Sequence, residues 1–411
     1  MSTVTKPILL DATYREEMEA VRHLISHQNA AIDLLASDKR AALVHDVATV
    51  AGLCASGEIL EVMDYGDYID PAWSEGENNY NPAMNLCHEA DAELEDGETV
   101  HGAFFEWDKT TPTGVPFDAP EALYYFDGTE GAGQKYITVS VAYNTGWVAG
   151  SNINITLTEA PAADDQLVVD CGQNYDNDPT ASRNWYVYAK GETTPKQSGT
   201  TSNSASGTKL GETSTVDTIH TNVRVNAPQR VVYGYNRWSQ SALRQRLNSA
   251  AAAGGWWTAQ NHWDRPPAQA ATVPGFLAGY SEDVYRHFKP IKVVTVANNA
   301  DGNIEDITYD RVFLSSLEQM YCVPQFAGKE GEYWEYYKRL LGRTTPAPTS
   351  QTYARLIKYA LNAPTSAQYC FLRSANRTYA YYVWGVLPSG GVYSATACYA
   401  SRCAPSVFIS E

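Results

Sequence analysis

Residues that could do chemistry are few in this sequence and widely spaced. It holds seven cysteines and eight histidines, but no CxxC pair, no HExxH motif, no GxSxG turn and no phosphate-binding loop. Cys87, His88 and Glu89 are adjacent, but no second pair of ligands follows at a spacing that would close a metal site. We therefore expect no catalytic residue, no metal and no cofactor.

The charge of the chain argues against one class of partner. Its net charge is −17, whereas a surface that binds nucleic acid needs positive charge over its footprint. Residues 51–100 carry 13 acidic residues and no lysine or arginine, while residues 201–411 carry more basic than acidic residues. We expect no nucleic-acid partner and two halves that belong to different domains. The acidic run is typical of a solvated face and less often of a cation site.

Nothing in the sequence predicts export or membrane insertion. The stretch 6–10 is too short for the apolar core of a signal peptide. No run of 18 apolar residues occurs, so we expect no membrane insertion. The cysteines form an odd and sparse set, which indicates free thiols from a reducing compartment.

Residues 1–55 are predicted to form a helical N-terminal segment. Apolar residues recur there at intervals of mostly three or four positions; they are Met18, Val21, Ile25, Ile32 and Leu35. Two interpretations stay open. The helix packs on its own domain, or it is a short coiled coil that joins copies of the chain, with a trimer favoured.

Residues 56–190 are predicted to form a β-rich domain, with a β-sandwich as the expected form. Two stretches, 136–143 and 152–158, alternate apolar and polar residues as strands do. The following stretch, 191–217, is rich in Ser, Thr and Gly, which predicts a long loop or linker.

The remainder, 218–411, is predicted to be an α+β domain. Helices are expected over 238–253 and 281–289, and a hairpin is expected where 291–297 and 304–309 flank an Asn- and Gly-containing turn. The fold class expected for the whole chain is multidomain, with an N-terminal helix, a central β-sandwich-like domain and a C-terminal α+β domain.

The most specific segment lies near the end of the chain. Residues 369–410 include six tyrosines among many Ser, Gly and Ala residues, and residues 370–410 contain no Asp, Glu, Lys, Gln, Met or His. Tyrosine offers a large amphipathic contact area at low entropic cost, and small residues leave room and hydrogen bonds, as in antibody binding sites. The composition therefore predicts a recognition surface.

Residues that we call the frame run between the tyrosines: Cys370–Arg377, Val383, Trp384, Val386, Ser389, Gly390, Val392, Ala397, Ala400 and Arg402–Pro405. With this frame, the segment resembles the variable region of diversity-generating retroelement target proteins. Those are phage and bacterial proteins with a C-type lectin fold, in the branch similar to formylglycine-generating enzymes. Residues 233–248 and 310–318 look like the same scaffold, so the resemblance covers residues 226–411.

The resemblance implies that the positions between frame residues vary and bind the ligand. In such proteins, adenine-directed mutagenesis of AAC-like codons yields Tyr, Ser, Thr, Ala, Gly, Leu or Cys, but not Glu, Gln, Lys, Met or Trp. The positions that we call the variable set all fall within the permitted types: Thr378, Tyr379, Tyr381, Tyr382, Gly385, Leu387, Gly391, Tyr393, Ser394, Ala395, Thr396, Cys398, Tyr399 and Ser401. We expect these side chains to be exposed over core strands that contain Trp384, Val386, Val392 and 404–409. A tyrosine-rich, lectin-like strand pair without diversification is the alternative.

The resemblance implies a protein that binds without catalysing a reaction. It would be a phage receptor-binding or virion display protein, with a host or bacterial surface protein or glycan as partner. It would sit on the virion, in a tail or head fibre, after cytoplasmic assembly, or on a bacterial cell surface. The apolar repeat in residues 1–55 favours a homotrimer. Two alternatives remain. Cys398 and Cys403 could hold copper, as in a formylglycine-generating oxidase, or the chain could be a purely structural virion decoration protein.

Overall fold

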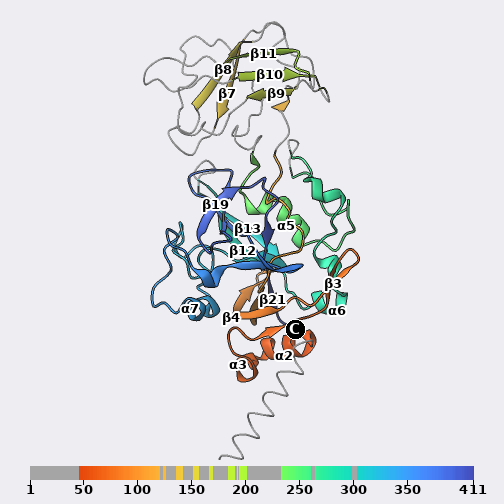
Figure 1. Cartoon of the computed structure of the whole chain (residues 1–411), viewed down its shortest axis with the longest axis vertical. Coiled ribbons are helices and arrows are strands. Elements are labelled where there is room, and N and C mark those ends of the chain that lie inside the picture. The colour runs from red at the N-terminus through yellow and green to blue at the C-terminus, as the bar shows by residue number, and fades with distance from the viewer. Residues whose placement is uncertain are drawn as a thin grey trace, which may run out of the picture.

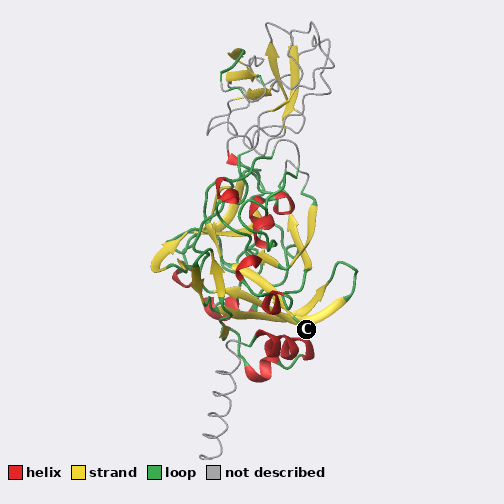
Figure 2. Ribbon diagram, turned by 90° about the vertical axis from the view of Figure 1, so that its right-hand side faces the viewer, coloured by secondary structure: helices red, strands yellow, loops and turns green. Residues whose placement is uncertain are grey.

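The computed structural model describes residues 46–120, 233–260, 264–298 and 303–411, together with strands and a few adjoining residues between 124 and 200. This part of the chain is mostly β-structure with few and short helices (Figures 1 and 2). No helix within it is long and apolar enough to cross a bilayer. The repeat of apolar residues between Met18 and Leu35, on which the coiled-coil interpretation rests, lies outside the described residues.

A five-stranded sheet forms the centre of the body (Figure 1). Its strands, in spatial order, are β1 (Tyr68–Ile69), β4 (Met84–Glu93), β5 (Thr99–Trp107), β21 (Pro405–Ile409) and β14 (Val312–Leu314). The pairing of β5 with β21 is antiparallel, with Phe105 opposite Val407. Both of these side chains are buried, so the hydrophobic effect favours the pairing.

This sheet corrects the expected division between 56–190 and 218–411. Strands from both stretches lie side by side in it, so residues 68–107 belong to the same folded unit as the C-terminal strands. The change in charge along the chain suggested separate domains. Charge reports mainly what faces solvent, however, and most of the residues that join β5 to β21 are apolar and buried, such as Ala103, Phe105, Val407 and Ile409.

A second, four-stranded sheet carries much of the frame. In spatial order it contains β19 (Val392–Thr396), β18 (Tyr382–Val386), β17 (Cys370–Ala375) and β20 (Arg402–Cys403). Three hairpins surround the two sheets: β2 (Trp73–Glu75) with β3 (Asn78–Tyr80), β12 (Ile291–Val296) with β13 (Glu305–Asp310), and β15 (Lys358–Ala360) with β16 (Ala363–Gln368). The hairpin predicted around residue 300 is confirmed.

The helices are short, and their ends follow ordinary capping rules. They are α2 (Val47–Ser56), α3 (Ile59–Val62), α5 (Ala242–Leu247), α6 (Glu282–Tyr285) and α7 (Glu335–Leu341), with 3₁₀ turns at η2 (Trp238–Gln240), η3 (Ala268–Ala271), η4 (Leu277–Gly279) and η6 (Ala354–Leu356). In α2, the Asp46 carboxylate accepts a hydrogen bond from the Thr49 N–H, and Gly57 ends the helix with φ of 74°.

The helix predicted over 238–253 is shorter than expected. Ser241 caps α5 by accepting from the Arg244 N–H, so the α-helix begins one turn late. It ends at Asn248, whose side chain bonds the backbone N–H groups of Arg311 and Val312. This tertiary contact holds Asn248 at the end of the helix. Residues 250–253, which were predicted to be helical, therefore lie outside the helix.

The strands between 124 and 200 form two further sheets (Figure 1). One is the hairpin of β7 (Tyr136–Val141) and β8 (Ser151–Thr156); the other has the order β11 (Gln197–Thr200), β10 (Asn184–Tyr188), β9 (Gln166–Val169) and β6 (Tyr124–Tyr125). The two strands predicted from alternation are confirmed as a pair. The predicted loop 191–217 needs a correction, because β11 lies within it and pairs with β10; residues 201–217 lie outside the described part.

Candidate functional site

The frame begins with β17, which is buried along its whole length. Arg373, on this strand, donates hydrogen bonds to the backbone carbonyls of Leu314 and Glu330 and to the Gln319 side chain. Burial lowers the pKa of Arg373 to about 10, so it remains charged at neutral pH. Because a buried charge is stable only when its donors are satisfied, these acceptors hold β17 in one position.

The turn from β17 to β18 is fixed by two asparagines. Asn236 donates through Nδ2 to the carbonyls of Asn376, Tyr379 and Tyr382, at 3.2, 2.9 and 2.8 Å. Asn376 accepts at Oδ1 from the N–H groups of Thr378 and Tyr379 and donates to Ser394 Oγ. The backbone of this turn is therefore set by partners outside the variable set as well as within it.

Strands β18 and β19 present tyrosines on the surface. Along β19, buried and solvent-facing side chains alternate, and Tyr393 is 61 % exposed. Tyr399, in the turn after β19, is 59 % exposed. Tyr369 donates from its hydroxyl to the Tyr393 carbonyl at 3.1 Å, which helps to fix the backbone that carries the more exposed ring.

The expectation that the whole variable set is exposed is corrected by the structure. Tyr393 and Tyr399 are exposed, whereas a middle group is half-buried: Thr378, Tyr379, Tyr382, Leu387, Ala395, Cys398 and Ser401. The remaining positions are buried: Tyr381, Gly385, Gly391, Ser394 and Thr396. The fourteen positions do lie in one region, on β18, β19 and the turns next to them.

Two of the buried positions show why part of the variable set is not exposed to solvent. Tyr381 is 4 % exposed because its ring lies against those of Tyr233, at 5.1 Å between centroids, and Tyr382, at 4.5 Å. A side chain at Gly385 would place Cβ 2.6 Å from the Cys370 carbonyl oxygen and 2.7 Å from the Tyr369 ring. Both positions are therefore constrained by packing.

The expected core strands are mostly where the sequence analysis placed them. Val386 and Val392 are buried, as is the whole of β21. Trp384 is half-buried, and its indole N–H donates to the Gln325 side chain at 3.1 Å. This side chain therefore lies at the boundary of the core.

The cysteines proposed as copper ligands differ in their surroundings. Cys403 is buried beside Thr111, and burial raises the pKa of its thiol to about 11. Cys398 is half-buried, and burial raises its pKa as well. Thiols with raised pKa values are protonated at neutral pH, which opposes the thiolate form that binds metals. Within the described residues, no group of three or more His, Cys, Asp or Glu side chains is placed to hold a metal ion.

Sequence reasoning missed Tyr369, which lies outside the variable set but contacts two of its positions. Tyr369 was taken as the boundary of the segment, although its ring and hydroxyl contact Gly385 and Tyr393. The high tyrosine content of the segment was the signal available for Tyr369.

Comparison with known proteins adds a family match. The chain is a mostly β protein with few helices, and residues 214–409 match a family model described as a domain of unknown function (DUF6273). No curated protein and no solved structure matches the chain. The matched stretch includes the frame and the variable set but not β4 and β5, although β21 pairs with β5.

Proposed function

We propose that this chain is a non-catalytic binding protein that recognises its partner through the tyrosine-bearing face around β19. The observation that carries the proposal is the contrast in exposure. Tyr393 and Tyr399 are exposed, while the frame strand β17, which lies in the same sheet as β19 with β18 between them, is wholly buried. Large aromatic side chains held on a rigid support bind partners with little loss of conformational entropy.

We propose further that the C-terminal unit is a C-type-lectin-like domain of the diversity-generating retroelement kind, encoded by a phage or prophage. The support is the agreement of the frame and variable set with that pattern, together with the exposure of Tyr393 and Tyr399, where substitution disturbs little packing. The buried positions restrict the proposal, because at Gly385 even the Cβ of alanine would lie 2.6 Å from the Cys370 carbonyl oxygen. Flanking DNA tests it: a reverse transcriptase gene and an adenine-rich near-copy of the codons for 370–409 are expected, and their absence would refute diversification.

The proposed partner is a protein or glycan on the surface of a bacterial host, and the proposed location is a virion fibre. A face with two exposed tyrosines offers modest affinity from a single copy. A homotrimer would compensate through multivalency, which raises avidity without new contacts. Light scattering on the full chain tests this point: a trimer mass is expected, and a monomer at micromolar concentration would exclude it.

The binding proposal is tested with fluorescently labelled protein on a panel of fixed bacterial cells. Replacing both Tyr393 and Tyr399 by Ser should abolish binding to any strain that the native protein labels. Tyr68→Ser is the matched control, because Tyr68 is also exposed but lies on β1, in the central sheet. Equal labelling by the double variant and the native protein would refute the role of this face.

A further inference from the structure

A pocket of about 310 Å³ adjoins the turn that follows β19. Cys398 and Ala400, the neighbours of the exposed Tyr399 in the chain, line one side of it. Residues from the segments 116–120 and 265–269, which lie outside the variable set, line the other sides. One position of the variable set, Cys398, therefore shares a pocket with residues that the variable set does not include.

Main-chain hydrogen bonds hold the turn that carries Cys398. The Val115 N–H donates to the Ser401 carbonyl at 3.0 Å, and the Asp118 N–H donates to the Ala397 carbonyl at 3.1 Å. Both bonds join backbone atoms on either side of position 398, so they do not depend on the side chain at that position. We therefore expect the turn to keep its place when this side chain changes.

The lining of the pocket is apolar and poor in hydrogen-bond donors. Three of its ten residues are alanines, and four are prolines, which have neither a polar side-chain atom nor a backbone N–H: Pro116, Pro120, Pro266 and Pro267. A sugar ring in this pocket would leave hydroxyl groups without partners, and each unpaired buried polar group costs about 1–3 kcal/mol. An apolar side chain carries no such cost. The lining therefore favours a protein side chain over a glycan.

Arg265 is the one charged residue that lines the pocket. Its side chain is exposed, and within the described part of the chain no carboxylate forms an ion pair with it. The two carboxylates nearest in the lining segments have other partners: Asp264 accepts from the Gln260 N–H, and the buried Asp118 accepts from the Tyr235 N–H at 3.2 Å. Arg265 can therefore pair with a carboxylate of a partner, which adds more to specificity than to affinity at an exposed site.

We propose that this pocket receives an apolar side chain that a partner protein presents beside an aspartate or glutamate. The apolar side chain packs against the prolines, and the neighbouring carboxylate pairs with Arg265. The side chain at position 398 sets the room in the pocket, so a larger residue there selects a smaller side chain of the partner. Since the pocket adjoins Tyr399, the assignment rests on the binding role proposed above for the tyrosine-bearing face. It narrows the partner from a protein or glycan to a protein.

The thiol of Cys398 reports on the pocket directly. It is half-buried, whereas the other five cysteines that the structure describes are buried. Iodoacetamide alkylation of Cys398 in the full chain is followed by peptide mass spectrometry, with N-acetyl-leucine present at about 10 mM, because ligands of this size bind with Kd values of about 1–10 mM. N-acetyl-leucine, which places a carboxylate beside an apolar side chain, should slow alkylation at least about twofold.

Three controls accompany this measurement. N-acetyl-leucine amide, which lacks the carboxylate, should slow alkylation of Cys398 less, and methyl glucoside should leave the rate unchanged. Alkylation of free glutathione in the same solution should not respond to any of the three compounds. Equal rates with and without N-acetyl-leucine, equal slowing by the acid and the amide, or slowing by methyl glucoside would refute the proposal.

Two variants at exposed residues test the pocket against the natural partner on labelled cells. Arg265→Glu reverses the charge, and Ala268→Phe, at the start of η3, fills the pocket. Each should weaken labelling by about fivefold or more. The matched controls are Arg286→Glu, at the end of α6, and Ala278→Phe, in η4; both residues are exposed and lie outside the pocket lining, so labelling should not change.

The outcomes separate the pocket from the tyrosine-bearing face. If replacing Tyr393 and Tyr399 by Ser abolishes labelling while Arg265→Glu and Ala268→Phe keep it, the pocket is refuted and the face is not. Treating the cells before labelling distinguishes the class of partner. Protease treatment should abolish labelling, whereas labelling that survives protease but is lost after periodate oxidation of glycans would overturn the assignment of a protein.

Discussion

Strands β17 and β19 belong to the same sheet, with β18 between them, yet the surroundings of their side chains differ. β17 is buried at every residue and binds its neighbours through Arg373 and Ser374. In β19, burial alternates, and Tyr393 stands in solvent. From this difference we expect tolerance to substitution to follow the surroundings of each residue and not its distance along the chain from a tyrosine. The proposed variable surface requires a rigid support of the kind that β17 provides.

Of the changes considered, removal of the Arg373 side chain from β17 should lower the stability of the protein most. Arg373→Ala leaves the carbonyls of Leu314 and Glu330 without their donor, and it leaves a cavity in the core. We expect the free energy of unfolding to fall by more than about 3 kcal/mol, measured by urea titration. The control is Arg377→Ala, whose exposed guanidinium lies over Phe326; it should cost less than about 1 kcal/mol. Similar costs for the two variants would mean that β17 is not the rigid support.

Tyr381 should behave as part of the frame in spite of its place in the variable set. Tyr381→Ala removes a ring packed on Tyr233 and Tyr382, and we expect a loss of about 3 kcal/mol in stability. The measurement is thermal and urea unfolding of the full chain. A cost below about 0.5 kcal/mol would place Tyr381 with the exposed tyrosines and would enlarge the recognition face.

The two glycines of the variable set should differ. At Gly385, an alanine Cβ would lie 2.6 Å from a backbone oxygen that cannot move without shifting β17, so we expect a cost of about 1–3 kcal/mol. At Gly391, the nearest atom to a Cβ is Leu387 Cδ1 at 3.4 Å, which is an ordinary contact, so Gly391→Ala should be nearly neutral. Urea unfolding measures the free energy of unfolding of the two alanine variants. If Gly385→Ala left this free energy unchanged, β17 and β18 would be able to move apart to make room for the new side chain.

The smallest effect on stability is expected at the exposed tyrosines. Replacing Tyr393 and Tyr399 by Ser should change the free energy of unfolding by no more than about 0.5 kcal/mol for each, since surface changes away from special features cost little. Differential scanning calorimetry provides the measurement. A clear fall in melting temperature would mean that these rings pack on part of the protein, and the comparison of β17 with β19 would then lose its meaning.

Sequence reasoning predicted the parts of this fold that depend on local pattern. The hairpin of β12 and β13 and the pairing of β7 with β8 follow from alternation and turn residues, which act over a few positions. The pairing of β5 with β21 joins residues about 300 positions apart, as for Glu106 and Ser406. Alternation on each strand predicts a buried face but does not identify the neighbouring strand, so the domain division was wrong.

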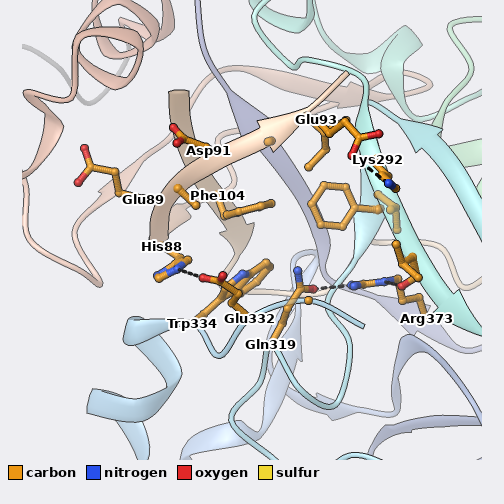
Figure 3. A pocket seen from close by; sticks show the side chains of 17 residues that line it. His88, Glu89, Asp91, Glu93, Phe104, Lys292, Gln319, Glu332, Trp334 and Arg373 are labelled. Atoms are coloured by element: carbon orange, nitrogen blue, oxygen red, sulfur yellow. Dashed lines mark hydrogen bonds and ion pairs between the residues drawn. The ribbon is translucent and has the colours of Figure 1, made fainter. Parts of the chain in front are cut away.

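The position of the candidate face could be proposed from the sequence, but the burial of its individual side chains could not. The composition of 369–410 located the face, because tyrosine with small residues is typical of recognition surfaces. Burial within it depends on partners supplied from elsewhere, such as Tyr233 against Tyr381 and the Cys370 carbonyl against Gly385. Spacing along one segment carries no information about such partners. The cavity lined by residues 88–93, 291–294 and Arg373 was missed for the same reason, since its walls come from segments far apart in the sequence (Figure 3).

One measurement tests the central claim directly: single-site saturation of positions 381, 385, 393, 394, 396 and 399, with folding of each variant scored by resistance to protease on a display surface. The account predicts that most substitutions at 393 and 399 keep native resistance, while most at 381, 385, 394 and 396 lose it. The same tolerance at all six positions, or intolerance at 393 and 399, would contradict a recognition face that varies over a fixed frame.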